Sequence, residues 1–289
     1  MITAGIDLAA RPKRTALVTM GWARTRAVIQ DVICPADDDV ILGAIEHAAK
    51  TGIDCPFGWP DAFVEFVIAH RADHVAIPQD SRGDDWRRAL TMRRTDVFVQ
   101  NTLHAAPLSV SADKIAHVAL RCAVLLARLD AAGRRVDRSG AGPVVEVYPA
   151  ASLRSWGLYR PGYKDSDKRE VLSCLTDDLL AAAPWLDCGP HEQTIRRSHD
   201  VFDAVIAALT ARAAGQGLTF PPSGDAQVAA EAEGCYRPPR RGRPDPRLLL
   251  RGTGFPWMSD IRSAGLCLRS SAVGHGGFGG LKTVSITRF

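Results

Sequence analysis

The sequence lacks any run of about 18 apolar residues, the length that a membrane-spanning helix requires. Its N-terminus also lacks a basic segment followed by an apolar stretch, because Asp7 interrupts the first hydrophobic run. We therefore predict a soluble, cytoplasmic protein with no export signal and no membrane partner. A length of 289 residues with 46% hydrophobic residues suits one sizeable domain.

Paired cysteines are also missing. The seven cysteines are odd in number, widely scattered and never spaced as Cys-Xaa-Xaa-Cys. This usage argues against a disulfide framework or a zinc knuckle, and it favours reduced, mostly structural thiols.

The main part of the chain has no excess of basic residues. The formal net charge is +4, yet residues 237–289 hold ten Lys or Arg against two Asp, a net of +8. Residues 1–236 therefore carry −4, so a polyanion would need local basic residues or bound metal to approach them. The segment from residue 237 is predicted to be a basic, Gly- and Ser-rich, weakly ordered tail. It is either a solvated extension or an arm for nucleic acid.

The first feature that is present is a strand at the start of the chain. Between residues 2 and 10, apolar side chains alternate with Thr3, Gly5 and Asp7. One face of such a strand suits a core, and the other offers a carboxylate. A charge in this position is costly unless a metal, a cation or a hydrogen-bond network pairs with it.

Strands and helices then alternate along the chain. Short connections predict an antiparallel meander from the first strand through residues 15–22 and 25–33. Apolar spacing predicts helices that begin near residues 37, 61, 111, 166 and 198, and buried strands at 52–55 and 143–148. We predict an α/β domain over residues 1–236, with a mixed sheet flanked by helices and a helical insertion at about 61–110.

Five carboxylates occupy unusual places in this pattern. Asp7, Asp54 and Glu146 lie within or at the end of predicted strands. Asp200 and Asp203 are three residues apart, so they project from one side of a predicted helix. Alanines continue that side, which would let the helix press against the sheet and bring its acids to the strand ends.

Converged carboxylates stay ionised together only when a cation neutralises them. An all-oxygen ligand set without Cys or His suits Mg²⁺ or Mn²⁺, and two such ions can promote hydrolysis of a phosphodiester. The residues thus predict a metal-dependent nuclease whose candidate catalytic acids are Asp7, Asp54, Glu146, Asp200 and Asp203.

Several of these acids also have a structural interpretation. Asp200 could be a first-turn acid favoured by the helix dipole, and Asp54 could be a turn residue. Glu146 could be the buried partner of an arginine such as Arg94. Asp7 is the hardest to explain in this way, because it interrupts the best strand.

Four motifs resemble a bacterial family, domain of unknown function 429, which is regarded as a group of predicted nucleases of the ribonuclease H-like fold. They are Gly-Ile-Asp in the first strand, Ile-Asp-Cys-Pro-Phe-Gly at 53–58, Glu-Val-Tyr-Pro-Ala at 146–150 and His-Asp-Val-Phe-Asp-Ala at 199–204. The resemblance spans about residues 2–236. It implies a five-stranded sheet in the order 3-2-1-4-5 with strand 2 antiparallel.

A second resemblance is to RuvC-type Holliday junction resolvases. It is carried by Glu146-Val-Tyr-Pro, then Lys164 and Lys168, then the pair Asp200 and Asp203. By this similarity Asp7 would be the central metal ligand and Asp54 the acid of the neighbouring parallel strand. The two helix-borne aspartates would complete the set.

Basic residues near these motifs are candidates for substrate binding. Arg93 and Arg94 match a pattern of the family, and guanidinium groups suit phosphate oxygens. An internal ion pair with a nearby carboxylate is the alternative. Lys168 is a further candidate, and His199 could either assist proton transfer or pack at the rim of the site.

Three functions remain open at this point. The first is a metal-dependent nuclease acting on DNA or RNA. The second is a non-catalytic module of the same fold that binds nucleic acid or a protein partner. The third is an actin-like ATPase-type phosphotransferase, which fits poorly because the chain lacks a Gly-Xaa-Xaa-Xaa-Xaa-Gly-Lys loop.

Overall fold

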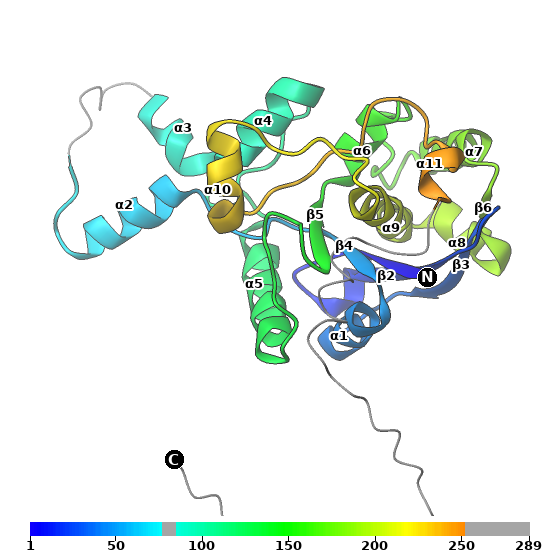
Figure 1. Cartoon of the computed structure of the whole chain (residues 1–289). Coiled ribbons are helices and arrows are strands. Elements are labelled where there is room, and N and C mark those ends of the chain that lie inside the picture. Colours follow the sequence, from blue (N-terminus) through cyan, green and yellow to red (C-terminus); the bar gives the residue numbers. More distant parts are fainter. Residues whose placement is uncertain (77–84, 252–289) are drawn as a thin grey trace, which may run out of the picture.

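The computed structural model describes residues 1–76 and 85–251 and contains a six-stranded mixed sheet with helices on both faces (Figure 1). The strand order is β5-β4-β1-β2-β3-β6. The strands are β1 (Ile2–Asp7), β2 (Ala16–Trp22), β3 (Ala27–Ile33), β4 (Lys50–Asp54), β5 (Val144–Val147) and β6 (Leu186–Asp187). The predicted α/β class with a mixed sheet is confirmed.

The number of strands differs from the prediction by one. β1 and β3 run antiparallel to β2, whereas β4 is parallel to both β1 and β5. The additional strand, β6, pairs parallel with the outer edge of β3 over two residues. Two residues are too few to show an alternating pattern, so no periodicity predicts this strand.

β4 begins earlier than predicted. The strand was predicted at residues 52–55, but Lys50 and Thr51 already pair with the neighbouring strands. The Lys50 side chain is 2% exposed, and its ammonium donates to the carbonyl oxygens of Gly140, at 2.6 Å, and Gly142. A lysine rarely marks a buried strand, and here two carbonyl groups compensate its burial.

The helices form a layer on each face of the sheet (Figure 1). α1 and α5 cover one face, and α9 with α6, α7 and α8 covers the other. None of the described helices is long and apolar enough to cross a membrane. The helices are α1 (Asp38–His47), α2 (Asp61–Arg71), α3 (Asp85–Thr91), α4 (Arg94–Leu103), α5 (Ala116–Ala131), α6 (Pro149–Ser155), α7 (Arg169–Ala182), α8 (Glu192–Arg197), α9 (His199–Gly215), α10 (Asp225–Glu233) and α11 (Pro246–Leu249).

α9 lies directly on the backbone of β1 and β4. A Cβ atom on Gly5 would be 2.0 Å from the carbonyl oxygen of Ala204, and one on Gly52 would be 2.4 Å from that of Ala207. The two glycines are partners in the parallel register of β1 and β4. The small side chains of α9 and these glycines therefore allow the close approach that the alanine pattern predicted.

The basic segment predicted to begin the tail packs against the domain as far as residue 251. Arg212 of α9 is buried, and its guanidinium donates to the carbonyl oxygens of Leu249 and Arg251 at 2.7 and 2.8 Å. The same guanidinium lies 5.0 Å from the centre of the Trp22 ring. Packed structure thus continues past residue 236, and the rest of the predicted tail, 252–289, lies outside the described residues.

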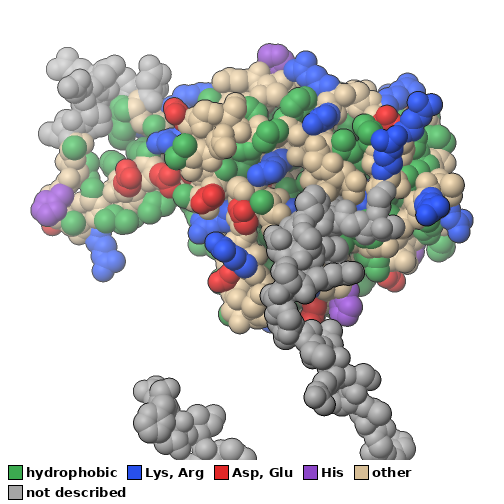
Figure 2. All heavy atoms as spheres, viewed as in Figure 1, with side chains coloured by type: hydrophobic (Ala, Val, Ile, Leu, Met, Phe, Trp, Pro, Cys, Tyr) green, Lys and Arg blue, Asp and Glu red, His purple; other side chains and the backbone are tan. Residues whose placement is uncertain are grey.

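The predicted insertion at about 61–110 contains α2, α3 and α4. α4 packs back on α10 and α6, whereas α2 and α3 project from the body (Figure 1). Hydrophobic side chains remain exposed along α2 (Figure 2), among them Val64, Val67 and Ile68.

Candidate active site

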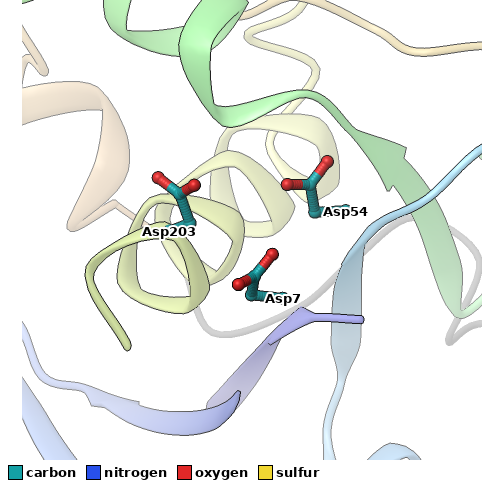
Figure 3. Close-up of side chains that lie close together, drawn as sticks. All are labelled: Asp7, Asp54 and Asp203. Carbon is teal, nitrogen blue, oxygen red and sulfur yellow. The ribbon is translucent and has the colours of Figure 1, made fainter. Parts of the chain in front are cut away.

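Three aspartates meet at one end of the sheet. Asp7 is the last residue of β1, Asp54 is the last residue of β4, and Asp203 is in the second turn of α9. Their carboxylates point toward a common centre (Figure 3), and one oxygen from each lies within 4.8 Å of the others. These residues were predicted to converge, and the structure brings them together.

The local structure explains this convergence. β1 and β4 are parallel neighbours with Asp7 directly opposite Asp54, so both side chains emerge at the same edge. α9 begins after Ser198, whose hydroxyl accepts a hydrogen bond from the Val201 amide at 3.3 Å. Direct contact of α9 with the sheet then carries Asp203 to the strand ends.

Asp203 is fully buried and has two close partners from the loop before α7. The Tyr163 hydroxyl donates to Oδ1 at 3.0 Å. The Lys164 ammonium lies 2.5 Å from Oδ2, although Oδ2 accepts no hydrogen bond of regular geometry. Lys164 is thus the cation that accompanies the three carboxylates in this structure.

The carboxylates oppose one another's ionisation. Burial and the neighbouring charge of Asp54 hold the pKa of Asp7 well above its usual value. Burial likewise raises the pKa of Asp54 to about 7, even though Lys164 favours its charged form. The pKa of Asp203 is also raised by burial, against the opposing effect of Lys164. One ammonium group therefore does not compensate the whole cluster.

These shifts predict that the metal-free protein is more stable at pH 5 than at pH 8. Asp54 titrates near pH 3.8 when unfolded and at about 7 when folded, so the folded state binds more protons between these values. The corresponding stabilisation is complete below pH 3.8 and is lost as the pH rises through about 7.

Thermal unfolding in EDTA should therefore give a melting temperature several degrees higher at pH 5 than at pH 8. Excess Mn²⁺ should remove most of the difference, because bound cations favour the ionised carboxylates. Equal melting temperatures at the two pH values in EDTA would contradict the pKa assignment.

Asp200 lies beside the three aspartates rather than among them. Its carboxylate Oδ1 is 3.0 Å from His199 Nδ1 and 3.5 Å from an Arg14 nitrogen. Burial opposes its ionisation, but the His199 hydrogen bond and the charge of Arg14 lower its pKa overall. Its negative charge contributes to the raised pKa of Asp7. Asp200 is thus an ionised carboxylate next to the cluster, and His199 is its partner.

A sequence profile of the family described as "Protein of unknown function (DUF429)" matches residues 5–227. The chain belongs to this family. The matched segment contains all three converging aspartates, as well as Lys164 and Asp200. Comparisons with curated proteins and with solved structures found no match.

In this DUF429 chain, Glu146 and Arg93 bind each other, and Glu146 does not belong to the group of three converging aspartates. Arg93 is 3% exposed, and its two terminal nitrogens donate to the Glu146 carboxylate at 2.6 and 2.9 Å. The guanidinium also bonds to Asp96, at 2.7 and 3.0 Å, and to the Glu233 carbonyl oxygen, at 3.0 Å. No donor of Arg93 is left for a phosphate, so this network is structural, and the partner of Glu146 is Arg93 rather than Arg94.

Arg93→Lys is expected to lower the free energy of unfolding by about 2–4 kcal/mol, because an ammonium group cannot reproduce this set of bonds. The matched control is Arg94→Lys, at the exposed neighbouring position, which should change stability by less than about 0.5 kcal/mol. Urea denaturation measures both. A substrate-binding Arg93 would instead show unchanged stability and weaker substrate binding.

Two other predicted substrate-binding residues lie away from the aspartates. The Arg94 side chain lines a separate hollow beside α10. Lys168 is exposed and pairs with Asp165 at 2.8 Å. Lys164, rather than the predicted Lys168, is the lysine that lies beside the aspartates. The two lysines belong to one loop, and its path rather than any local pattern decides which of them reaches the site.

Proposed function

We propose that this DUF429 protein is a divalent-metal-dependent nuclease that hydrolyses phosphodiester bonds in DNA or RNA. The observation that supports it most is the convergence of Asp7, Asp54 and Asp203 from two parallel strands and a helix. An acidic set of this origin is what the resemblance to ribonuclease H-like and RuvC-type enzymes implies.

The donor set fits Mg²⁺ or Mn²⁺. All its atoms are carboxylate oxygens, which these hard ions prefer, and the described residues add no Cys or His to the group. The fully buried Oδ2 of Asp203 lacks a regular hydrogen bond, and burial together with the acidic neighbours keeps the pKa of Asp7 well above its usual value in spite of Lys164. Further positive charge would stabilise the cluster.

Asp7, Asp54 and Asp203 would hold the ion or pair of ions, with Asp200 as the adjacent acid. When bound, the metal supplies the Lewis acidity that activates water and stabilises the leaving oxygen of a phosphodiester. Tyr163 orients Asp203 through its hydrogen bond to Oδ1. His199, hydrogen-bonded to Asp200, is placed to move a proton at the edge of the site.

Basic residues elsewhere on the surface support a polyanionic substrate. Two hollows that share Trp156 and Arg241 run beside α6 and the C-terminal segment. Arginines from both sides line them, namely Arg154, Arg240, Arg241 and Arg243. Such guanidinium groups can bind phosphates without reading the sequence.

The direct test is cleavage of end-labelled single-stranded, duplex and branched oligonucleotides of DNA and RNA in Mg²⁺ or Mn²⁺, with EDTA as the blank. We expect cleavage of at least one substrate that depends on added metal. ATP hydrolysis without strand cleavage would favour a phosphotransferase instead.

Lys164 provides a second test, since its ammonium and an added metal would compete for Asp203. Lys164→Met is expected to bind Mn²⁺ roughly tenfold more tightly by calorimetry and to melt at a lower temperature in EDTA. Lys168→Met, which alters the exposed lysine of the same loop, is the matched control and should bind Mn²⁺ like the unaltered protein.

If neither lysine variant nor the unaltered protein binds Mn²⁺, the three aspartates are not a metal site even when the competing ammonium is removed. The non-catalytic binding module would then be the better interpretation of this fold.

A further inference from the structure

A cavity of about 220 Å³ opens directly beside the aspartates. Asp7, Asp54 and Lys164 are among the residues that line it. Its apolar lining comes from three separate parts of the chain and includes Leu108, Ile115, Val118 and Tyr148. An acidic site is thus continuous with an apolar recess.

The apolar wall is partly open to solvent. Leu108, in the loop after α4, is 57% exposed, and Tyr148, which follows β5, is half-buried. The Tyr148 ring stands edge-on to Tyr236, with ring centres 6.2 Å apart, and Tyr236 also lines the cavity. The recess therefore offers an aromatic and aliphatic surface that solvent can reach.

Three of the charged residues that line the cavity are already paired with one another. Glu146 and Asp96 line the cavity, but both carboxylates are occupied by the Arg93 guanidinium. These paired groups have few free donors or acceptors for hydrogen bonds to the polar edge of a ligand. Contact with the wall would depend mainly on shape and stacking.

We propose that this cavity holds one unpaired nucleobase of the nucleotide whose phosphate faces Asp7 and Asp54. The proposal deepens the proposed nuclease function and rests on it. Its consequence is that the substrate presents an unpaired nucleotide at the cleavage position, in a single strand or extruded from a duplex, and that the identity of the base matters little.

The size and position of the cavity support this occupant. Sites for drug-sized ligands begin at about 300 Å³, so this smaller recess suits a single ring system. A base within a duplex stays stacked between its neighbours and must leave the stack to enter such a pocket. A base is joined through its sugar to the phosphate, which matches an apolar recess next to a site for phosphate chemistry. Every base has a π-face for an aromatic wall, so such binding tolerates any sequence.

The test uses oligonucleotides that contain one 2-aminopurine and resist cleavage through phosphorothioate links, in DNA and RNA versions, with Mn²⁺ present. We expect the fluorescence of the single strand to change on binding, and the matching duplex to bind at least tenfold more weakly. A single strand with an abasic nucleotide in place of 2-aminopurine should compete about 5-fold to 100-fold less well. Comparison of the DNA and RNA arms shows which sugar is accepted.

Leu108→Ala should weaken binding of the single strand several-fold. Its matched control is Leu120→Ala, since Leu120 is equally exposed at 57% but lies on α5 outside the cavity, and this variant should bind like the unaltered protein. Equal binding of duplex and single strand, an abasic competitor as good as the parent, or equal loss in both variants would overturn the proposal. Binding of 2-aminopurine without metal-dependent cleavage would refute the nuclease function and leave the base pocket standing.

Discussion

Asp7→Asn is expected to reduce metal-dependent cleavage by about a thousandfold or more. Asp7 lies between Asp54 and the helix-borne acids, so the loss of its charge removes the central ligand of the proposed metal site. Metal ions supply several kcal/mol of transition-state stabilisation, and each 1.4 kcal/mol corresponds to about a factor of ten. Single-turnover cleavage of the best oligonucleotide substrate measures the effect.

The same substitution should not harm the fold. Asn is close in size to Asp, and it removes a carboxylate whose ionisation at neutral pH is opposed by burial and by its acidic neighbours, and therefore works against folding. We therefore expect Asp7→Asn to melt at a higher temperature than the unaltered protein in EDTA at pH 8. Asp31→Asn, on an exposed position of β3, controls for the substitution itself. Full activity in Asp7→Asn would refute the catalytic assignment.

Gly5→Ala is expected to cause the largest loss of stability of any single methyl group added to this protein, more than about 4 kcal/mol. The new Cβ would lie 2.0 Å from the Ala204 carbonyl oxygen and 2.3 Å from the Ala208 nitrogen. Both atoms belong to the backbone of α9, so no side-chain rotation relieves the contact. α9 would have to move off β1, and Asp203 would move with it.

Gly43→Ala is the matched control, because a Cβ there meets no atom within 4 Å and the residue lies inside α1. Alanine should stabilise this position by about 0.5–1 kcal/mol. Urea denaturation and circular dichroism compare the two variants. If Gly5→Ala folds with unchanged stability, α9 does not lie on β1 as described.

Much of the fold follows from local patterns in the chain. Alternation in residues 2–8 predicts β1 and its two faces, and the alanine side of α9 predicts its close approach to the sheet. Lys50 and the two-residue β6 escaped prediction for opposite reasons. A lysine argues against a buried strand unless the carbonyl groups that bind its ammonium are known. A strand of two residues is too short to show any alternation of apolar and polar residues.

Among the acids, local pattern could not separate metal ligands from structural partners. Glu146 and Asp54 both belong to short buried strands that end nearby. The two acids differ in the segments that pack against them, since Arg93 pairs with Glu146 and no arginine of the described residues pairs with Asp54. The same holds for Lys164 and Lys168, which differ in the direction in which their loop presents them.

The sequence by itself determined the α/β class, the family, and the presence of aspartates at the ends of two strands and on one helix. The α/β class and the positions of the aspartates follow from the spacing of apolar residues along the chain, whereas the family follows from the resemblance of its motifs. Only the tertiary structure decided which acids share one centre, which lysine accompanies them, and that an apolar recess opens beside them. These depend on contacts between segments up to about two hundred residues apart, and such contacts are set by packing rather than by any local pattern.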